Sequence, residues 1–454
     1  MFDDNSYNSV IAKSSFVVEE NNILNVSDFG AVCDGVTDDT AAINAALVEA
    51  AKSKKALKFD KKGTCLVSNK LVVTNGITQI FGGKIKFTGK ITGIRLEGVV
   101  HGLAENVKDL RIHHMNIETN GYGILGYNNS RVKIHNNVIR NKKSVCSIYL
   151  FAHNLGAEDA VDNVISYNKI SGQKNWGGGV YIISGLDYKY PSDANFGAAT
   201  VLWFKEKTNA SLTYAVRNTT ITHNTIDGSY YGMYLSGAQN TLVSENTTIN
   251  NTVSFTLSNG SNNNRIINNT LKEMVSSAVN LAYGSSDNLI RGNNISSSVA
   301  TGEGLLQAYV GAKRNLFEKN AVESTGIYGP KWMLYLAVHA DGNNVRNNIF
   351  TGSYGRACIA IEPAWDETQL FFAHRGSYLT KTYKHHVWAN QDSDLIVIKD
   401  NILDVHSWRE GAPEIFYSQI TDDLGVHRLT NLVIENNTIV NPKPNYAEPY
   451  FLED

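Results

Sequence analysis

Two glutamates in strand-like segments have side chains suited to acid–base chemistry. Glu362, in "CIAIEPAW", is a carboxylate on an otherwise apolar segment beside Trp365, where its pKa can rise. Glu414 lies in the next such segment, "APEIFYSQ". Hydrolysis of a glycosidic bond needs two carboxyl groups, one as acid and one as base or nucleophile. We expect Glu362 and Glu414 to be catalytic, with Asp366 and Glu367 as alternatives.

A second set of residues suits β-elimination from a uronic acid chain. In that reaction a base removes the proton next to the uronate carboxylate, and a cation or neutral acid stabilises this carboxylate. Tyr309 and His339 are the candidate catalytic groups, and Tyr335 and Arg356 lie nearby in the repeat described below. Further basic groups come from a later segment, at His374, Arg375, His385 and His386. The alternative role for each is a contact to a sugar.

We expect no metal and no cofactor. The candidate segments carry no calcium-type run of acidic residues and no three-ligand zinc spacing. The four cysteines are far apart and form no CxxC pair: Cys33, Cys65, Cys146 and Cys358. We expect buried reduced thiols rather than a disulfide framework.

A repeat of about two dozen residues must position these groups. Each unit has a short apolar segment, an asparagine and another apolar residue, as in "TTITHNTI", "TLVSENTTI" and "NLIRGNNI". This period, with two or three short strands per unit, predicts a right-handed parallel β-helix in which the asparagines stack and bond one another. The aligned asparagines are Asn137, Asn168, Asn224, Asn246, Asn269, Asn293, Asn320, Asn348, Asn401 and Asn437.

Each repeat also holds a second strand-like segment whose alternate residues point outward. One predicted outward column reads Tyr149, Tyr181, Tyr234, Thr256, Asn280, Gln307, Tyr335 and Ala360. The next reads Phe151, Ile183, Ser236, Ser258, Ala282, Tyr309, Ala337 and Glu362. We expect an exposed polar and aromatic strip that binds a linear glycan through Tyr181, Tyr234, Gln307, Tyr335 and Arg356.

Two insertions interrupt the repeat, at about residues 185–216 and 365–391. Both are rich in aromatic residues and lysine, and insertions in solenoids often line the binding face. We expect Trp365, His374 and Arg375 to contact substrate. An ordinary packed loop or a subunit contact is the alternative.

One amphipathic helix is predicted in the segment 29–51. Its apolar stripe is formed by Ala42, Ile43, Ala46, Leu47 and Ala50. Thr37 or Asp38 is the expected N-cap. A solenoid exposes the apolar interior of its first coil, and we expect the helix to cover that end.

The segment "VSDFGAVCDGVTDDTAAINAALVEA" resembles the N-terminal signature "FGAxGDGxTDDTxAIxxAI" of pectate-lyase-superfamily β-helices. Phage tailspike depolymerases and alginate epimerases share that signature. Cys33 stands where the signature has its first glycine after "FGA", and Leu47 replaces the last isoleucine. The resemblance covers about 25 residues, implies the β-helix fold and marks the cap rather than an active site.

Composition limits the partners. The 454 residues carry 41 basic and 43 acidic side chains, a net charge of −2, which gives no electrostatic case for nucleic acid or membrane binding. No apolar run reaches the length of a membrane helix, and the start "MFDDNSYNSV" is not a signal peptide. We therefore expect an extracellular or virion-associated protein, as in phage tails, and the tailspike resemblance implies a homotrimer.

The expected organisation is an N-terminal extension (1–25), a capping segment (26–60), a β-helix (61–440) and a C-terminal tail (441–454). The leading hypothesis is a depolymerase that hydrolyses a bacterial capsular or exopolysaccharide with paired carboxylates. A uronan lyase is the first alternative, and a β-helix that binds glycan without catalysis is the second.

Overall fold

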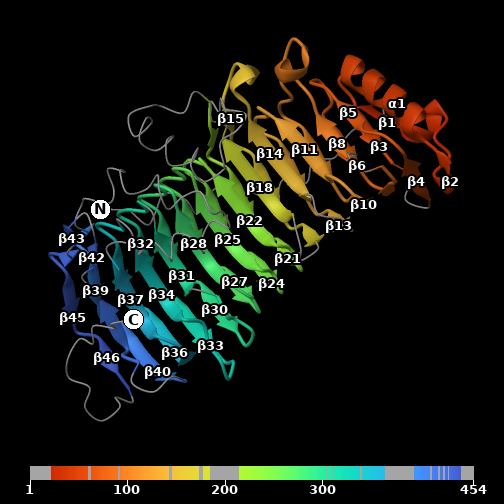
Figure 1. Cartoon of the computed structure of the whole chain (residues 1–454). Helices are drawn as coiled ribbons and strands as arrows, with labels where there is room; N and C mark the ends of the chain where they lie inside the picture. The colour runs from red at the N-terminus through yellow and green to blue at the C-terminus, as the bar shows by residue number, and fades with distance from the viewer. Residues whose placement is uncertain are drawn as a thin grey trace.

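The computed structural model describes fourteen stretches of the chain. Figure 1 shows three long sheets that wind about one axis, from α1 (Thr40–Ser53) near one end to the strands β45 and β46 at the other. The described residues are 22–59, 63–89, 93–142, 146–172, 177–184, 214–302, 304–309, 311–337, 340–362, 393–408, 412–417, 420–422, 425–427 and 429–440.

The first sheet has fourteen strands. In spatial order they are β1 (Ile23–Asn25), β3 (Ala56–Lys58), β6 (Gln79–Phe81), β9 (Arg111–His113), β12 (Lys133–His135), β16 (Val164–Ser166), β20 (Thr220–Thr222), β23 (Leu242–Ser244), β26 (Arg265–Ile267), β29 (Leu289–Arg291), β32 (Leu316–Glu318), β35 (Asn344–Arg346), β39 (Val397–Lys399) and β45 (Val433–Glu435).

The second sheet also has fourteen. They are β2 (Asp34–Asp38), β4 (Thr64–Val67), β7 (Lys84–Phe87), β10 (Asn116–Thr119), β13 (Val138–Asn141), β17 (Lys169–Ser171), β21 (Thr225–Asp227), β24 (Thr247–Ile249), β27 (Thr270–Lys272), β30 (Asn294–Ser297), β33 (Ala321–Ser324), β36 (Ile349–Tyr354), β40 (Ile402–Ser407) and β46 (Thr438–Ile439).

The third sheet has twelve strands. They are β5 (Leu71–Val73), β8 (Ile94–Leu96), β11 (Ile124–Tyr127), β14 (Ile148–Ala152), β18 (Gly178–Ser184), β22 (Tyr231–Ser236), β25 (Val253–Ser258), β28 (Ser277–Ala282), β31 (Gly304–Tyr309), β34 (Trp332–Ala337), β37 (Ala357–Glu362) and β41 (Ile415–Tyr417).

Short elements complete the described structure. The strand pairs are β15 (Ala160–Val161) with β19 (Val216–Arg217), β38 (Ser393–Asp394) with β44 (Leu429–Thr430), and the antiparallel β42 (Ile420–Asp422) with β43 (Gly425–His427). The 3-10 turns are η2 (Val26–Phe29), η3 (Val99–His101) and η4 (Asn154–Gly156).

Each coil between the first and the last contributes one strand to each long sheet in turn. The strands β6, β7 and β8 are followed one coil later by β9, β10 and β11, and each strand pairs in parallel with its counterpart. Neighbouring parallel strands lie about 4.8 Å apart, so each coil adds one rung to the stack. The predicted right-handed parallel β-helix is confirmed.

Stacked asparagines hold the turns between the first and second sheets together, as predicted. Asn269 is typical: its backbone N–H and its side-chain amide both donate to Oδ1 of Asn293 on the next coil, at 3.0 and 2.9 Å. The same amide donates to the carbonyl oxygen of Val243 on the preceding coil, at 3.0 Å. All ten predicted asparagines join this ladder, from Asn137 to Asn437.

The residue before each ladder asparagine takes a left-handed backbone conformation. Asn268, Lys319 and Asn347 have φ of 54°, 55° and 56°, and glycine occupies the same place at Gly292. This conformation reverses the chain and points the next side chain inward. The turn therefore requires both the asparagine and a tolerant residue before it.

A second asparagine ladder precedes the strands of the first sheet and was missed in the sequence. Asn264 donates to Oδ1 of Asn288 from both its backbone N–H and its side-chain amide, and Asn288 does the same to Asn315. The backbone N–H of Asn315 then donates to Asn343. The signal was the asparagine that opens "NRI", "NLI" and "NLF".

The helix α1 covers the first coil with the face predicted from the sequence. Ile43, Ala46, Leu47 and Ala50 are buried and join the interior core, and Ala42 is partly buried against it. The strand β1 already pairs with β3 in the first sheet. The end of the expected N-terminal extension thus supplies β1, and the expected capping segment supplies β2 and β3 besides the helix.

The helix start differs by one or two residues from the prediction. The helix begins at Thr40, and Asp39 is the N-cap rather than Thr37 or Asp38. The Asp39 carboxylate is buried and accepts the backbone N–H of Val32 at 2.7 Å. Asp38 still serves the first turn, because it accepts the N–H of Thr40 at 3.1 Å. The acidic pair thus fastens both the helix and the chain leading into it.

Two of the four cysteines form a disulfide, which corrects the expectation of reduced thiols. Cys33 and Cys65 are 32 residues apart in sequence and bonded in space. They meet because β2 and β4 are neighbouring strands, with Asp34 opposite Thr64. Cys146 and Cys358 are free and buried, as predicted.

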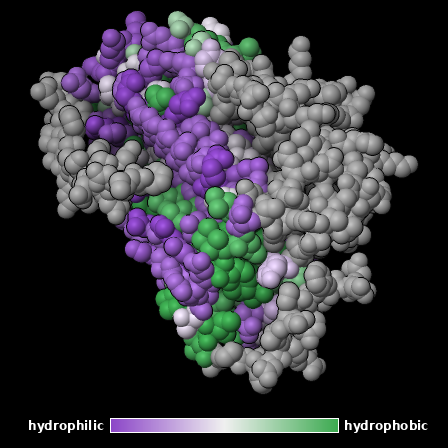
Figure 2. All heavy atoms as spheres, turned by 90° about the vertical axis from the view of Figure 1, so that its left-hand side faces the viewer, coloured by the Kyte–Doolittle hydropathy of each residue, from purple (hydrophilic) through white to green (hydrophobic). Residues whose placement is uncertain are grey.

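The last described coil leaves interior positions uncovered. Ile434 and Ile439 pair with Ile398 and Leu403, which are fully buried, yet they are 38% and 37% exposed. Figure 2 views this end of the solenoid and shows hydrophobic surface beside hydrophilic surface. No helix in the described part of the chain is long and apolar enough to cross a membrane.

We predict that Asn269→Ala lowers the free energy of unfolding by about 2–3 kcal/mol, because the carbonyl of Val243 and the N–H of Asn246 lose buried partners. Urea unfolding followed by circular dichroism measures this change. The matched control is Asn294→Ala, at an exposed position of β30, with an expected change within about 0.5 kcal/mol. Equal losses in both variants would contradict a ladder-specific role.

We also predict a fixed thiol count. Denatured protein alkylated without a reductant should gain two alkyl groups, at Cys146 and Cys358, and four after reduction. Intact-mass spectrometry counts the groups. Four groups without a reductant would show that Cys33 and Cys65 are not bonded in the protein.

Candidate active site on the outer face of the third sheet

The two outward columns predicted for the third sheet are present in the predicted register. Strand pairing joins, in order, Tyr149, Tyr181, Tyr234, Thr256, Asn280, Gln307, Tyr335 and Ala360. It also joins Phe151, Ile183, Ser236 and Ser258, and then Ala282, Tyr309, Ala337 and Glu362. Candidate residues far apart in sequence therefore lie on one face, one rung apart.

A third outward column comes from an irregularity that strict alternation does not predict. In β34, Met333 and Leu334 both belong to the interior core, whereas Trp332 and Tyr335 belong to a separate outer cluster. Trp332 pairs with Gly304 of the preceding rung. Its ring stacks on that of Tyr335, with centroids 4.1 Å apart and planes at 6°. Trp332 is thus a site residue that the sequence analysis missed, and the three-residue aromatic spacing in "WMLY" was its signal.

An aromatic strip covers the N-terminal half of this face. The ring centroids of Tyr149 and Tyr181 are 6.1 Å apart, and those of Tyr181 and Tyr234 are 5.3 Å apart. Tyr231, in the irregular column, lies 5.2 Å from Tyr234, and Phe151 lies 6.0 Å from Tyr149. These side chains are half-buried and follow one another along the helix axis.

The C-terminal half of the strip is buried, which corrects the expectation of an exposed strip throughout. Gln307, Tyr335 and Ala360 have exposed fractions of 7%, 2% and 0%. They belong to or border an outer apolar cluster built on Trp332, with Tyr309 packed against it. Alternation predicts which face a residue occupies, but not whether that face is covered.

The predicted ligand Gln307 is already engaged within the protein. Its side-chain amide donates to Oγ of Ser277 at 2.7 Å and to the carbonyl oxygen of Gly304 at 2.8 Å. Gln307 therefore braces the strands rather than presenting a free amide group.

The buried half of the face contains a carboxylate held by a tyrosine. The hydroxyl of Tyr335 donates to Oε2 of Glu362 at 2.5 Å. Glu362 is half-buried at the end of β37 and is the only carboxylate in the two predicted columns. The stacked Trp332 fixes the tyrosine ring, so the donor orients the carboxylate. A carboxylate held in this way can act as a base or a nucleophile.

Tyr309 shares a column with Glu362 but is not its neighbour. Ala337 lies between them, so the two side chains start about 10 Å apart. The amide of Asn280 donates to the Tyr309 hydroxyl at 3.2 Å. Burial raises the pKa of Tyr309, and the hydrogen bond from Asn280 only partly opposes this. Tyr309 therefore stays a neutral phenol near neutral pH.

The structure does not bring Glu414 to Glu362. Ile359 pairs with Ile415, so Glu362 and Glu414 are offset by four strand positions, about 13 Å along the strand. That offset exceeds the separation of about 6.5–9.5 Å in inverting glycosidases. Glu414 lies instead near buried Cys358, whose pKa is raised by burial and, to a smaller extent, by this carboxylate.

Of the remaining catalytic and binding candidates in the C-terminal part of the chain, Arg356 is the one that the described residues include. Arg356 is half-buried in the turn before β37, at the opposite end of that strand from Glu362. His339, Trp365, Asp366, Glu367, His374, Arg375, His385 and His386 lie outside the described residues.

Burial also tunes the tyrosines of the aromatic strip. Loss of solvent contact raises the pKa of Tyr149, Tyr181 and Tyr231, and neighbouring tyrosines add to the effect. These phenols keep their protons across the physiological range. They can stack on a ligand or donate hydrogen bonds, but none is poised as a base.

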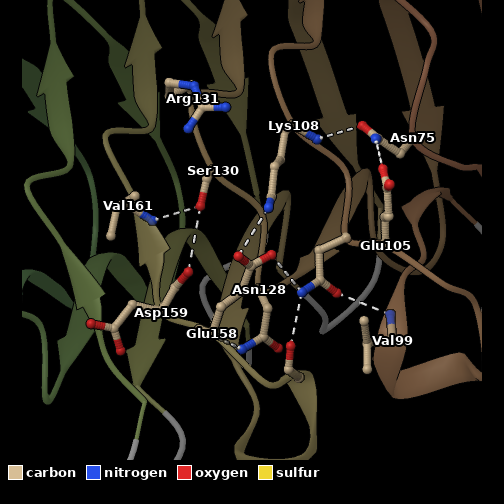
Figure 3. A network of polar contacts seen from close by, with 12 residues as sticks. Asn75, Val99, Glu105, Lys108, Asn128, Ser130, Arg131, Glu158, Asp159 and Val161 are labelled. Carbon is tan, nitrogen blue, oxygen red and sulfur yellow. Dashed lines mark hydrogen bonds and ion pairs between the residues drawn. The ribbon is translucent and has the colours of Figure 1, made fainter.

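A polar network supports the loops that flank this half of the face (Figure 3). The carboxylate of Glu158 accepts from the amide of Asn106 and the ammonium of Lys108, both at 2.9 Å. The amide of Asn128 donates to the backbone carbonyl of Glu158 at 2.6 Å. The loop after β14 is thereby tied to the loop after β8, which fixes the border of the aromatic strip.

Among the described residues, one group of three metal-ligand side chains is close enough for an ion. It consists of Cys33, Asp39 and Cys65. The two sulfurs are consumed in the disulfide and the carboxylate accepts backbone N–H groups. This group is therefore structural and lies at the cap, away from the third sheet.

We predict that stability falls as the pH rises above about 10. The buried tyrosines hold their protons in the folded state, whereas the unfolded chain releases them near pH 10, so their stabilising contribution is full below that pH and lost above it. Urea midpoints measured from pH 8 to 11.5 give the slope. Tyr181→Phe should flatten it, and Tyr167→Phe, at an exposed site, should not. An identical slope in all three proteins would contradict the assignment.

The chain matches one family model and several solved structures. Residues 199–380 match the family model of NosD, a periplasmic copper-binding protein. No curated protein sequence matches the chain. The A-module of the Azotobacter vinelandii mannuronan C-5 epimerase AlgE6 superposes with a TM-score of 0.55 at 13% identity, over 92% of this chain and 100% of the module.

A second solved structure is similar at comparable length. DFA-IIIase from Arthrobacter chlorophenolicus A6 superposes with a TM-score of 0.50 at 11% identity, over 94% of this chain and 100% of the enzyme. Identities this low establish the architecture alone. The chain is thus a right-handed parallel β-helix protein of the architecture that these two enzymes share.

Proposed function

We propose that the protein is a polysaccharide depolymerase that hydrolyses glycosidic bonds on the outer face of its third sheet. The observation that carries this proposal is Glu362, held at 2.5 Å by Tyr335 at one end of aligned aromatic columns. A long face with one oriented carboxylate suits a polymer cut at one point along its length.

The aromatic strip supports a linear sugar polymer as the ligand. Apolar faces of sugar rings pack on aromatic rings, and Tyr149, Tyr181 and Tyr234 repeat one per rung along the axis. Neutral phenols at these positions also supply hydroxyl donors to sugar oxygens. A bacterial capsular or exopolysaccharide has the extended form that such a column accommodates. The expected extracellular or virion setting and the homotrimer stay predictions.

The mechanism assigns Glu362 the role of base or nucleophile. A second carboxyl group must protonate the leaving oxygen. Asp366 and Glu367 follow closely in sequence and are the candidates for this acid, whereas Glu414 is offset along the strand. Trp332 and Tyr335 act as positioning residues, because they orient the carboxylate through stacking and a hydrogen bond.

Elimination is the less favoured reaction. It needs a base beside the uronate, and the pKa of Tyr309 is shifted upward, away from that role. Arg356 lies at the other end of the strand from Glu362, so a uronate beside Glu362 would not have Arg356 to bind its carboxylate. The AlgE6 module is named for action on mannuronan, a uronan, but the shared feature is the fold.

One observation favours a second function, glycan binding without catalysis. The half-buried strip from Tyr149 to Tyr234 has aromatic side chains but no carboxylate in the two predicted columns. That half of the face has the composition of a binding surface alone. An adhesion β-helix would show saturable glycan binding and no new chain ends.

We predict that Glu362→Gln lowers depolymerase turnover at least about 100-fold while substrate binding persists. The assay incubates the protein with a panel of bacterial capsular and exopolysaccharides and identifies products by mass spectrometry. Hydrolysis adds one water per cut. Glu323→Gln, an exposed glutamate on β33 of the second sheet, is the control and should retain full turnover.

The other outcomes decide among the alternatives. Unsaturated products without added water would replace hydrolysis with elimination. Binding without cleavage across the panel would favour the adhesion function. Full turnover in Glu362→Gln would remove this carboxylate from the mechanism, whatever the reaction.

A further inference from the structure

Three imidazoles cluster where neighbouring strands of the first sheet end, on a different surface from the candidate active site. His113 ends β9 and His135 ends β12, directly opposite each other in neighbouring strands. His114 follows in the turn and is exposed. The depolymerase proposal makes no use of these residues.

Ring stacking fixes the position of His113. Its ring lies between Phe81 and His135, with centroid distances of 5.2 and 4.9 Å and interplanar angles of 10° and 9°. The three rings come from successive rungs, so the strand register holds the stack. His113 therefore has little rotational freedom.

A hydrogen bond selects the tautomer of His113. Its Nε2 lies 2.9 Å from Oε1 of Gln79, and an amide oxygen only accepts, so His113 donates from Nε2 and leaves Nδ1 unprotonated. Metal-binding histidines commonly donate their other ring N–H to a carbonyl or carboxylate in this way. The hydrogen bond therefore leaves the Nδ1 lone pair of this rigidly held ring able to accept a proton or a metal ion.

The second ligand atom lies beside the first. Nδ1 of His114 is 2.8 Å from Nδ1 of His113, and because His113 leaves this nitrogen unprotonated, His114 donates a hydrogen bond to it in the metal-free protein. A metal ion between the two nitrogens would replace that proton. Metal–imidazole bonds are about 2.0 Å long, and two such bonds at right angles place their nitrogens about 2.8 Å apart. A tetrahedral ion would require about 3.3 Å. The observed spacing fits the tetragonal geometry of Ni²⁺ or Cu²⁺.

We propose that His113 and His114 bind one divalent transition-metal ion of tetragonal preference through their Nδ1 atoms. The exposed His114 ring turns to share the ion and carries its proton on Nε2, facing solvent. Gln79 and the stacked His135 hold His113 in place, and water completes the coordination. The ion is bound outside the glycan face and takes no part in glycan cleavage.

His223 offers a matched control within the same fold. It occupies the same left-handed turn position as His114, with φ of 56° against 54°, on a later coil. Both of its ring nitrogens are engaged, Nδ1 with the hydroxyl of Thr222 and Nε2 with the carboxylate of Glu245. An imidazole in that turn is therefore not by itself a metal ligand.

Calorimetric titration of Ni²⁺ into the full-length, tag-free protein tests this proposal. We expect saturable binding of one ion per chain and a rise in melting temperature with the metal. His114→Ala should weaken binding at least about tenfold and abolish the metal-dependent thermal shift, whereas His223→Ala should bind as the native protein does. Because His114 is exposed, its replacement should leave the metal-free melting temperature unchanged.

Three results would overturn the site. They are no saturable Ni²⁺ binding, unchanged affinity in His114→Ala, or an equal loss in His223→Ala. A further variant, Gln79→Leu, removes the acceptor that selects the tautomer. Undiminished affinity in that variant would refute the role assigned to Gln79.

Discussion

The structure depends on one repeated interaction, the amide ladder inside the turns of the solenoid. Each asparagine accepts from the coil before it and donates onward, as Asn246, Asn269 and Asn293 do at 2.9–3.1 Å. A residue with positive φ must precede each of them. These two requirements recur in each coil from Asn137 to Asn437, so these coils stack in the same register. Parallel strands alone would allow slippage, which the ladder prevents.

Because the register is fixed, residues at equivalent positions of successive coils form columns. Tyr335 and Glu362 are 27 residues apart, yet their side chains bond because one coil separates them. The same rule brings Cys33 to Cys65 and His113 to His135. In a solenoid, chemistry is therefore assembled between residues one coil apart, and a spacing that looks remote in sequence is local in space.

Sequence reasoning succeeded where periodicity alone determines the outcome. It identified all ten ladder asparagines and the register of both outward columns, because both follow from aligning repeats. It failed where strict alternation does not hold or a specific partner decides: the irregular column that turns Tyr231 and Trp332 outward, the disulfide that needs two specific thiols, and the burial of Tyr335. Whether an outward-facing side chain is buried depends on what packs over it. The alternation of residues along a strand does not encode that.

The separation of the two proposed sites follows from the same architecture. Residues in a solenoid contact only the coils before and after them, so strain at one face is not passed to another. The face that bears Glu362 belongs to the third sheet, whereas His114 follows β9 of the first sheet. Effects of substitutions at sites this independent add. A β-helix can therefore carry a metal site and a glycan face without compromise between them, because the stacked strands and the interior core, rather than either site, hold the coils together.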